Sequence, residues 1–195
     1  MAMKLLQAIN NYLFVRQAKQ YISETERERR FVSYDKAKSV LILFESDFTE
    51  KNPAIRKIIA QLQQDGKKVS AWGFIDKKEI MTSILPDFRI LHHKQTDFFQ
   101  KPVISYINEL EVLEFDLLLD LTIQPILPLQ YFALYSKATF KVGAHKTDAA
   151  IYDFVLDIES LKKQPEEDEI QASEVNEVYM YDQIIFYLKS IQTND

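Results

Sequence analysis

The chain has 195 residues, 47% of them hydrophobic, with 24 basic and 29 acidic residues, no cysteine and three glycines. Average usage would supply about 14 glycines. The sequence therefore lacks the glycine clusters with which dinucleotide-binding turns, P-loops and kinase-type loops approach phosphate groups. Without cysteine, disulfides, thiol catalysis, zinc fingers and iron–sulfur clusters are excluded. The net charge of −5 gives no overall attraction to nucleic acid or to an anionic membrane, so neither is expected as a partner.

The length predicts a single domain, residues 1–195, because domains hold about 150 residues. The first 20 residues are interrupted by polar side chains and lack a small-residue cleavage site, so no signal peptide is predicted. No run reaches the roughly 18 apolar residues of a membrane span. A cytoplasmic protein is therefore expected.

The N-terminal unit, residues 1–30, is predicted to be a helix over residues 3–29 with two apolar faces. At about 100° per residue, one face carries Leu5, Leu6, Ile9, Tyr12 and Leu13, and the other carries Phe14, Val15, Ala18, Tyr21 and Ile22. A bent helix packed on its own domain is the favoured interpretation. The alternatives are a helix that breaks near residues 11–13, and a helix whose second face contacts a partner.

Strand and helix patterns alternate over residues 38–158. Buried strands are predicted at 39–44, 68–75, 88–92, 115–121, 139–142 and 152–157. Helices are predicted from Asn52-Pro53 to Gly66, from Asp76 (in capping-box spacing with Glu79) to before Pro86, from Pro102 through Leu110, and around Leu129–Tyr135. An acidic linker, 159–172, and a final helix, 174–192, follow.

This alternation predicts an α/β fold with right-handed crossovers. We expect an open, mostly parallel Rossmann-like sheet of five to six strands in the order 3-2-1-4-5-6. Helices should cover both faces, with the N- and C-terminal helices packed on the sheet.

Candidate ligand-binding residues lie at the carboxyl ends of strands 1 and 4, the switch point where ligands bind in open α/β sheets. They are Ser46 and Asp47 after strand 1, and Asp120 and Thr122 at the end of strand 4. Two carboxylates there could hold a general base and its partner, or a hard cation. Asp47 also has capping-box spacing with Glu50 and could simply cap a helix. Asp120 lies in an apolar strand, where a carboxylate needs hydrogen bonds or a cation.

A second candidate is the segment after strand 5, Gly143–Thr147, where Lys141 and His145 could receive an anionic group. The competing interpretation is a surface turn. Adjacent His92 and His93 point to opposite faces of a strand, so they cannot easily share a metal. No metal, cofactor or catalytic residue is predicted.

The stretch from about Val40 to Val142 resembles the N-terminal half of heptosyltransferase-type glycosyltransferases of the GT-B arrangement. Phe115-Asp116-Leu117-Leu118-Leu119-Asp120-Leu121 is similar to a "YDLVIDL" strand of that family, and Ser136–Gly143 is similar to a segment ending in "R-x-G". Where the family has a glycine–aspartate pair after its first strand, this chain has Glu45-Ser46-Asp47. The family's nucleotide-sugar site lies in a C-terminal domain that this sequence does not include. The resemblance thus implies an acceptor-domain-like fold of a bacterial protein rather than a complete transferase.

Two functions are compatible with these features. The first is a non-catalytic binding or protein-interaction module that contacts a protein partner or a second copy through its terminal helices. The second, implied by the resemblance, is a protein or glycosyltransferase-like enzyme that binds a sugar or phosphorylated metabolite in the crevice between strands 1 and 4. A membrane surface, contacted through the N-terminal helix, ranks last.

Overall fold

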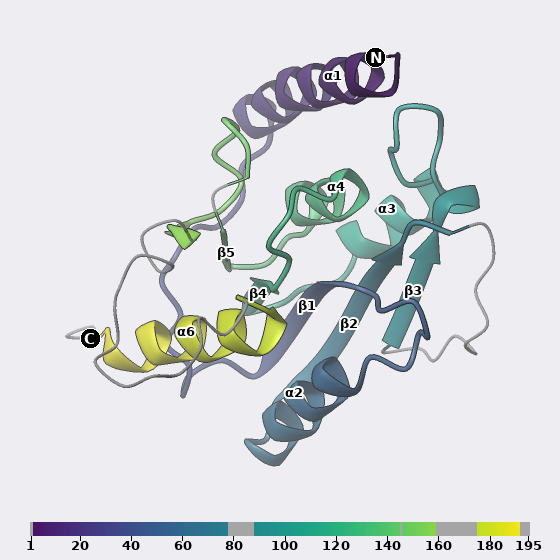
Figure 1. Cartoon of the computed structure of the whole chain (residues 1–195). Helices are drawn as coiled ribbons and strands as arrows, with labels where there is room; N and C mark the ends of the chain where they lie inside the picture. Colours follow the sequence, from purple (N-terminus) through teal and green to yellow (C-terminus); the bar gives the residue numbers. More distant parts are fainter. Residues whose placement is uncertain (1, 78–87, 145, 159–174, 192–195) are drawn as a thin grey trace.

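The computed structural model describes residues 2–77, 88–144, 146–158 and 175–191. Figure 1 shows its elements. The strands are β1 (Ser39–Glu45), β2 (Lys68–Ile75), β3 (Phe88–His92), β4 (Leu117–Asp120), β5 (Phe140–Ala144) and β6 (Phe154–Leu156). The helices are α1 (Ala2–Glu24), α2 (Pro53–Gln64), α3 (Ile104–Glu111), α4 (Leu127–Tyr135) and α6 (Glu177–Ser190), with a 3-10 turn η1 (His93–Gln95). No helix in the described part of the chain is long and apolar enough to cross a membrane.

The six strands form one parallel sheet in the order β3-β2-β1-β4-β5-β6. Strand β1 lies at the centre, where Ile42 is aligned with Ala71 of β2 and with Leu119 of β4. Both faces of β1 are covered, which explains its uninterrupted apolar sequence. The predicted fold class and strand order are confirmed.

Helices cover both faces of the sheet. Helices α2 and α6 pack on one face, and α3 and α4 on the other, with α1 lying outside α4 (Figure 1). The ring of Phe14 on α1 meets Tyr131 of α4 edge-to-face at 4.8 Å, and Gln17 Nε2 donates to the Tyr135 hydroxyl at 2.8 Å. The N-terminal helix is thus held on the sheet largely through α4.

Helix α1 is continuous to Glu24, so the alternative of a break near residues 11–13 is excluded, and the predicted end at residue 29 is wrong. Its two apolar faces have different environments, because Phe14 and Ala18 are buried while Leu5 and Tyr12 are exposed. The chain leaves the helix after Glu24 and runs beside β5, where Arg30 N donates to Thr139 O at 3.4 Å.

The sequence predicts a cap at each end of α2, and the structure confirms the C-terminal one but not the side-chain cap at the N-terminus. Asn52 occupies the position before the helix, followed by Pro53, but its backbone is left-handed (φ 46°) and its side chain makes no cap hydrogen bond. Gly66 (φ 78°) ends the helix as predicted: its N–H donates to Gln63 O, and Lys67 N donates to Leu62 O, both at 3.0 Å.

Other boundaries shift by a few residues. Strand β4 is shorter than predicted, β5 extends through Gly143 to Ala144, and β6 is confined to Phe154–Leu156. Helix α3 begins at Ile104, because Pro102 instead forms a bridge with Thr96. The acidic linker 159–172 and most of the predicted helix after Asp76 lie outside the described residues.

Candidate functional site

Asp120, the last residue of β4, is the centre of a buried polar network. Its side chain is fully buried beside that of Lys146, which is 1% exposed, and Lys146 Nζ lies 2.8 Å from Asp120 Oδ2. The same carboxylate oxygen accepts a hydrogen bond from the Tyr152 hydroxyl. Asp120 Oδ1 accepts from Thr122 N at 2.9 Å and from Thr122 Oγ1 at 2.6 Å, and Lys146 Nζ donates to Thr122 Oγ1 at 2.5 Å. The buried charge therefore has both of the forms of compensation that burial demands, hydrogen bonds and a cation.

Tyr152 reaches Asp120 because β5 has a glycine beside it. A Cβ atom at Gly143 would lie 2.7 Å from the Tyr152 ring, closer than real Cβ contacts. The ring therefore occupies space that any other residue at position 143 would fill. Gly143 lies inside β5 rather than after it, and it serves this close approach rather than a phosphate-binding turn.

Burial dominates the electrostatics of the network. It lowers the pKa of Lys146 from its ordinary 10.5, an effect that the charge of Asp120 opposes. Burial, and next the negative charge of Asp120, raise the pKa of Tyr152 well above 10.0. At neutral pH the Tyr152 hydroxyl thus stays protonated and donates to Asp120.

A pocket of about 520 Å³ opens beside this network, with Lys146 in its wall. The pocket lies between α1, the loop after β4, the first turn of α4 and the segments after β5 and β6. Its lining consists of Asn11, Phe14, Val15, Ile123, Gln124, Pro125, Gln130, Lys146, Thr147, Asp148, Asp157 and Ile158. This position, beyond the carboxyl ends of the strands, is where open α/β sheets bind ligands.

Gln130 in the pocket wall has an amide group whose hydrogen bonds are incomplete. The residue is 3% exposed, and its Nε2 has no hydrogen-bond partner among the described residues. A buried amide donor without an acceptor costs about 1–3 kcal/mol. An acceptor oxygen from a bound molecule would remove that cost.

The residues predicted after strand 1 form a separate arrangement. The Asp47 carboxylate accepts from Asn52 N at 2.8 Å and Lys51 N at 3.1 Å, and Asp47 N donates to Asn52 Oδ1 at 2.7 Å. Asn52 Nδ2 donates to Ser46 Oγ at 3.1 Å. The predicted capping box of Asp47 with Glu50 is wrong, because residues 47–50 form a turn and Asp47 closes the loop before α2. Asp47 and Asp120 do not share a network.

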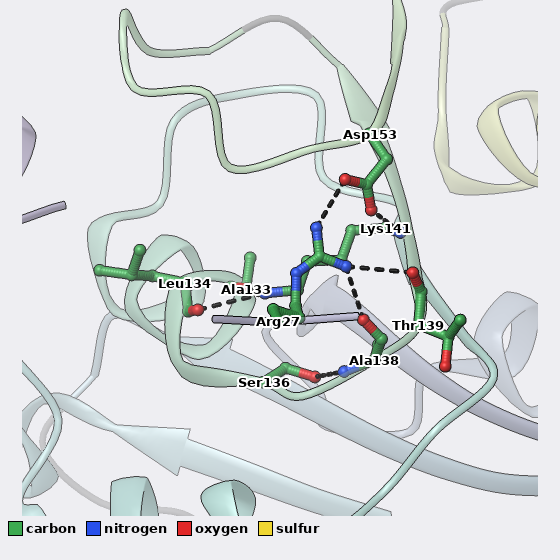
Figure 2. Close-up of polar contacts among 8 residues, drawn as sticks. All are labelled: Arg27, Ala133, Leu134, Ser136, Ala138, Thr139, Lys141 and Asp153. Carbon is green, nitrogen blue, oxygen red and sulfur yellow. Dashed lines mark hydrogen bonds and ion pairs between the residues drawn. The ribbon is translucent and has the colours of Figure 1, made fainter. Parts of the chain in front are cut away.

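Lys141 lies in β5, and its side chain reaches the end of α4 rather than the crevice. Figure 2 shows its Nζ donating to Ala133 O (2.6 Å) and Leu134 O (3.1 Å) in the last turn of α4. Burial, and next the charge of Arg27, lower the pKa of Lys141 well below 10.5. The amine satisfies carbonyl groups that the helix itself leaves unpaired. The structure therefore gives Lys141 a structural role away from the crevice, and its role in receiving an anion stays a prediction.

Arg27 and Asp153 complete the cluster in Figure 2. Arg27 donates to Asp153 Oδ1 at 2.5 Å, to Ala138 O at 2.7 Å and to Thr139 O at 3.1 Å. Both charged side chains are 11% exposed. This largely buried ion pair holds the chain after α1 against β5, in an extended segment where the sequence predicts the last turns of a helix.

The remaining candidates are placed as follows. His145 lies outside the described residues, so its predicted role stays a prediction. His93 is exposed, with Nδ1 3.7 Å from Asp76 Oδ1, and half-buried His92 accepts from Lys94 N at 3.3 Å. Among the described residues, no group of three or more His, Asp or Glu side chains could hold a metal ion.

Asp120 and Thr122 are the predicted candidates that the structure brings together. The sequence did not single out Lys146, Tyr152 or Gln130. The sequence indicates an anion site in the segment Gly143–Thr147, which contains Lys146, but nothing in the local pattern connects Lys146 with Asp120. Gln130 lies on a helix that is buried all round, where one glutamine among apolar residues was the available signal.

The fold and the site define a Rossmann-like α/β domain with a polar pocket above a buried lysine–aspartate pair. The model of a family of unknown function (DUF6913) matches residues 10–172, so the chain belongs to that family. No curated protein and no solved structure matches the chain. The matched residues include the whole Asp120 network and every residue that lines the pocket.

Proposed function

We propose that this protein is a non-catalytic binding module that holds a small polar molecule in the pocket beside Asp120. The observation that carries the proposal is the buried Lys146–Asp120 pair in the wall of that pocket. Removing two charges from water is costly, and a purely apolar packing would serve stability as well. A charged pair at the carboxyl ends of the strands, where open α/β sheets bind ligands, supports a site that orients a polar ligand.

The lining favours a ligand rich in hydroxyl groups over a phosphorylated one. The charge of Lys146 is balanced by Asp120, which leaves Asp148 and Asp157 as the other charged residues in the lining. Their negative charge repels phosphate, whereas carboxylates accept hydrogen bonds from hydroxyl groups. The Gln130 amide offers a donor to a hydroxyl oxygen. A sugar fits this chemistry better than a sugar phosphate.

A catalytic role has less support. Tyr152 and Lys146 both interact with Asp120, and the raised pKa of Tyr152 keeps its hydroxyl from acting as a base at neutral pH. A glycosyltransferase-like enzyme stays a prediction from the resemblance. A bacterial source and a cytoplasmic location also stay predictions.

The test is an NMR titration of the protein with matched pairs: D-glucose against glucose 6-phosphate, and myo-inositol against its monophosphate. The expected result is saturable shifts of the Gln124 and Thr147 amides, stronger with the neutral member of each pair. Gln130→Met should weaken binding about fivefold, the value of one hydrogen bond, without lowering stability. Gln63→Met, at an exposed position of α2, is the matched control.

Two results would count against the proposal. If no compound shifts these amides at millimolar concentration, the pocket is not a sugar-type binding site. If binding occurs but Gln130→Met and Gln63→Met behave alike, the ligand lies elsewhere on the molecule.

Contact with a protein partner or a second copy stays a prediction. Exposed apolar side chains on α6, Val178 and Phe186, support it. Light scattering on the full chain and on Phe186→Ser tests it: a mass above 22.9 kDa that the substitution returns to the monomer value is the expected result.

A further inference from the structure

Helix α1 presents an apolar row that the fold does not use. Phe14 and Ala18 are buried where α1 packs on the rest of the domain. On the opposite side of the helix, Leu5 is 64%, Ile9 44% and Tyr12 68% exposed. These three residues are spaced four and three apart, so they form one continuous stripe. Exposed apolar stripes of this kind mark interaction surfaces.

A short hairpin beside α1 adds two aromatic rings to this surface. The hairpin, residues 96–102, is closed by the Thr96–Pro102 bridge. Its turn is held by the Asp97 carboxylate, which accepts from Phe99 N at 2.8 Å and Lys101 N at 2.9 Å. Phe98 is 71% exposed and packs edge-to-face on Phe99 at 5.4 Å. The turn that carries Phe98 and Phe99 is therefore fixed by hydrogen bonds, while the Phe98 ring stays exposed to solvent.

The hairpin and the helix border a common hollow. A pocket of about 340 Å³ is lined by Leu13, Arg16, Gln17 and Gln20 of α1, by Asp97, Phe99 and Lys101 of the hairpin, and by Tyr131. Arg16 and Lys101 place a cation on each side of it. The one acid among these lining residues, Asp97, has its carboxylate turned toward the hairpin amides. The hollow is suited to an anionic headgroup between the two cations.

The charge of these segments differs from that of the chain as a whole. Residues 2–24 and 93–103 contain five basic residues (Lys4, Arg16, Lys19, Lys94 and Lys101) and two acidic ones (Glu24 and Asp97), a net charge of +3 in a chain of net −5. Two copies meeting through this surface would bring like charges together. An anionic surface would be attracted to it.

We propose that the outward face of α1 and the 96–102 hairpin dock the protein on an anionic phospholipid membrane. We call this the α1–hairpin surface: Leu5, Ile9, Tyr12, Arg16, Lys19, Phe98, Phe99 and Lys101. The apolar stripe and Phe98 enter the boundary between headgroups and acyl chains, while the basic residues contact lipid phosphates. The sequence ranks a membrane last because the net charge of −5 gives no overall attraction to anionic lipid.

The experiment measures co-sedimentation of the full chain with vesicles of phosphatidylcholine alone and of phosphatidylcholine mixed with phosphatidylserine. Binding should require phosphatidylserine and should fall as salt rises from about 0.1 M to about 1 M, which shortens the Debye length from about 10 Å to about 3 Å. The triple variant Arg16→Gln, Lys19→Gln, Lys101→Gln should bind about a hundredfold more weakly, because each basic residue near an anionic surface contributes a factor of about five. Leu5→Ser with Tyr12→Ser should weaken binding at least tenfold.

The matched control is Lys51→Gln, Lys57→Gln, Lys68→Gln, which makes the same change in net charge with exposed lysines around α2 on the other face of the sheet. It should bind like the unaltered protein, and all variants should show unchanged circular dichroism and melting temperature. No binding to the mixed vesicles, or equal losses in both triple variants, would overturn the proposal. So would a dimer that Tyr12→Ser dissociates, which assigns the surface to a second copy, or binding to poly-glutamate without binding to vesicles, which assigns it to an acidic protein.

Discussion

At the scale of single residues, Gly143 shows how one missing side chain shapes the site. The Tyr152 ring lies where a Cβ atom would be, and Tyr152 in turn donates to Asp120. A methyl group at position 143 would push the ring away from the carboxylate. The glycine is therefore part of the site although it offers no polar side chain.

We expect Gly143→Ala to lower the free energy of unfolding by about 1–3 kcal/mol, the usual cost of overpacking. The double variant Gly143→Ala/Tyr152→Leu removes the ring and should show less than the sum of the two single losses. Urea denaturation of the four proteins gives this coupling. If the two losses add, the contact between position 143 and the Tyr152 ring is not the reason that Gly143→Ala destabilises the protein.

Asp116 is a residue whose role the sequence did not indicate. Its Oδ2 accepts from Lys38 N at 2.7 Å, Ser39 N at 2.8 Å and Ser39 Oγ at 3.0 Å, which joins the start of β4 to the start of β1. Burial would raise the pKa of Asp116, but these hydrogen bonds outweigh it and hold the pKa below the ordinary 3.8. The ionised form is thus favoured by folding.

A carboxylate with a lowered pKa stabilises the fold above its ordinary pKa, and this contribution is lost as the pH falls through the lowered value. We expect Asp116→Asn to reduce the free energy of unfolding by about 1.5–3 kcal/mol at pH 7, as for hydrogen bonds to charged groups. Urea denaturation at a series of pH values should show the difference shrinking below the ordinary pKa. A difference independent of pH would contradict this assignment, and exposed Asp35→Asn is the control.

At the scale of elements, α1 behaves as a helix with one structural face. The Phe14 side packs on α4, and the Arg27–Asp153 pair fixes the chain that follows. The hydrophobic periodicity alone could not choose between the faces, because both are apolar. Burial against α4 made the choice.

The asymmetry gives a direct test. Phe14→Ala should lower the free energy of unfolding by about 3–5 kcal/mol, the cost of deleting a buried ring. Tyr12→Ala, on the exposed side, should change it by less than about 0.5 kcal/mol. Thermal or urea unfolding measures both, and equal effects would show that α1 packs through the other face.

At the scale of the whole molecule, the sheet is most protected at its centre. Strands β1 and β4 have neighbours on both sides and helices on both faces, whereas β3 and β6 are edges. We expect native-state hydrogen exchange of β1 and β4 amides only through global unfolding, and faster exchange in β3 and β6 through local opening. Edge amides as slow as those of β1 would contradict this ranking.

The sequence by itself determined the α/β class and the strand order, because buried strands are continuous apolar runs and the helices between them carry their own start and stop signals. Pro53 and Gly66 bound α2 through local backbone chemistry. The sequence also selected Asp120 and Thr122. A carboxylate in an apolar strand needs hydrogen bonds or a cation to offset its burial, and the carboxyl ends of parallel strands meet at one edge of the sheet.

Only the tertiary structure decided what compensates Asp120. Lys146 and Tyr152 lie between β5 and β6, and Tyr152 is 32 residues from Asp120 in the chain. No local pattern records such a pairing. The same holds for Lys141, whose environment is the end of a helix that precedes it in the chain. Local sequence fixes which backbone conformations are favourable. The partners of a buried charge depend on the crossovers that bring distant strands together.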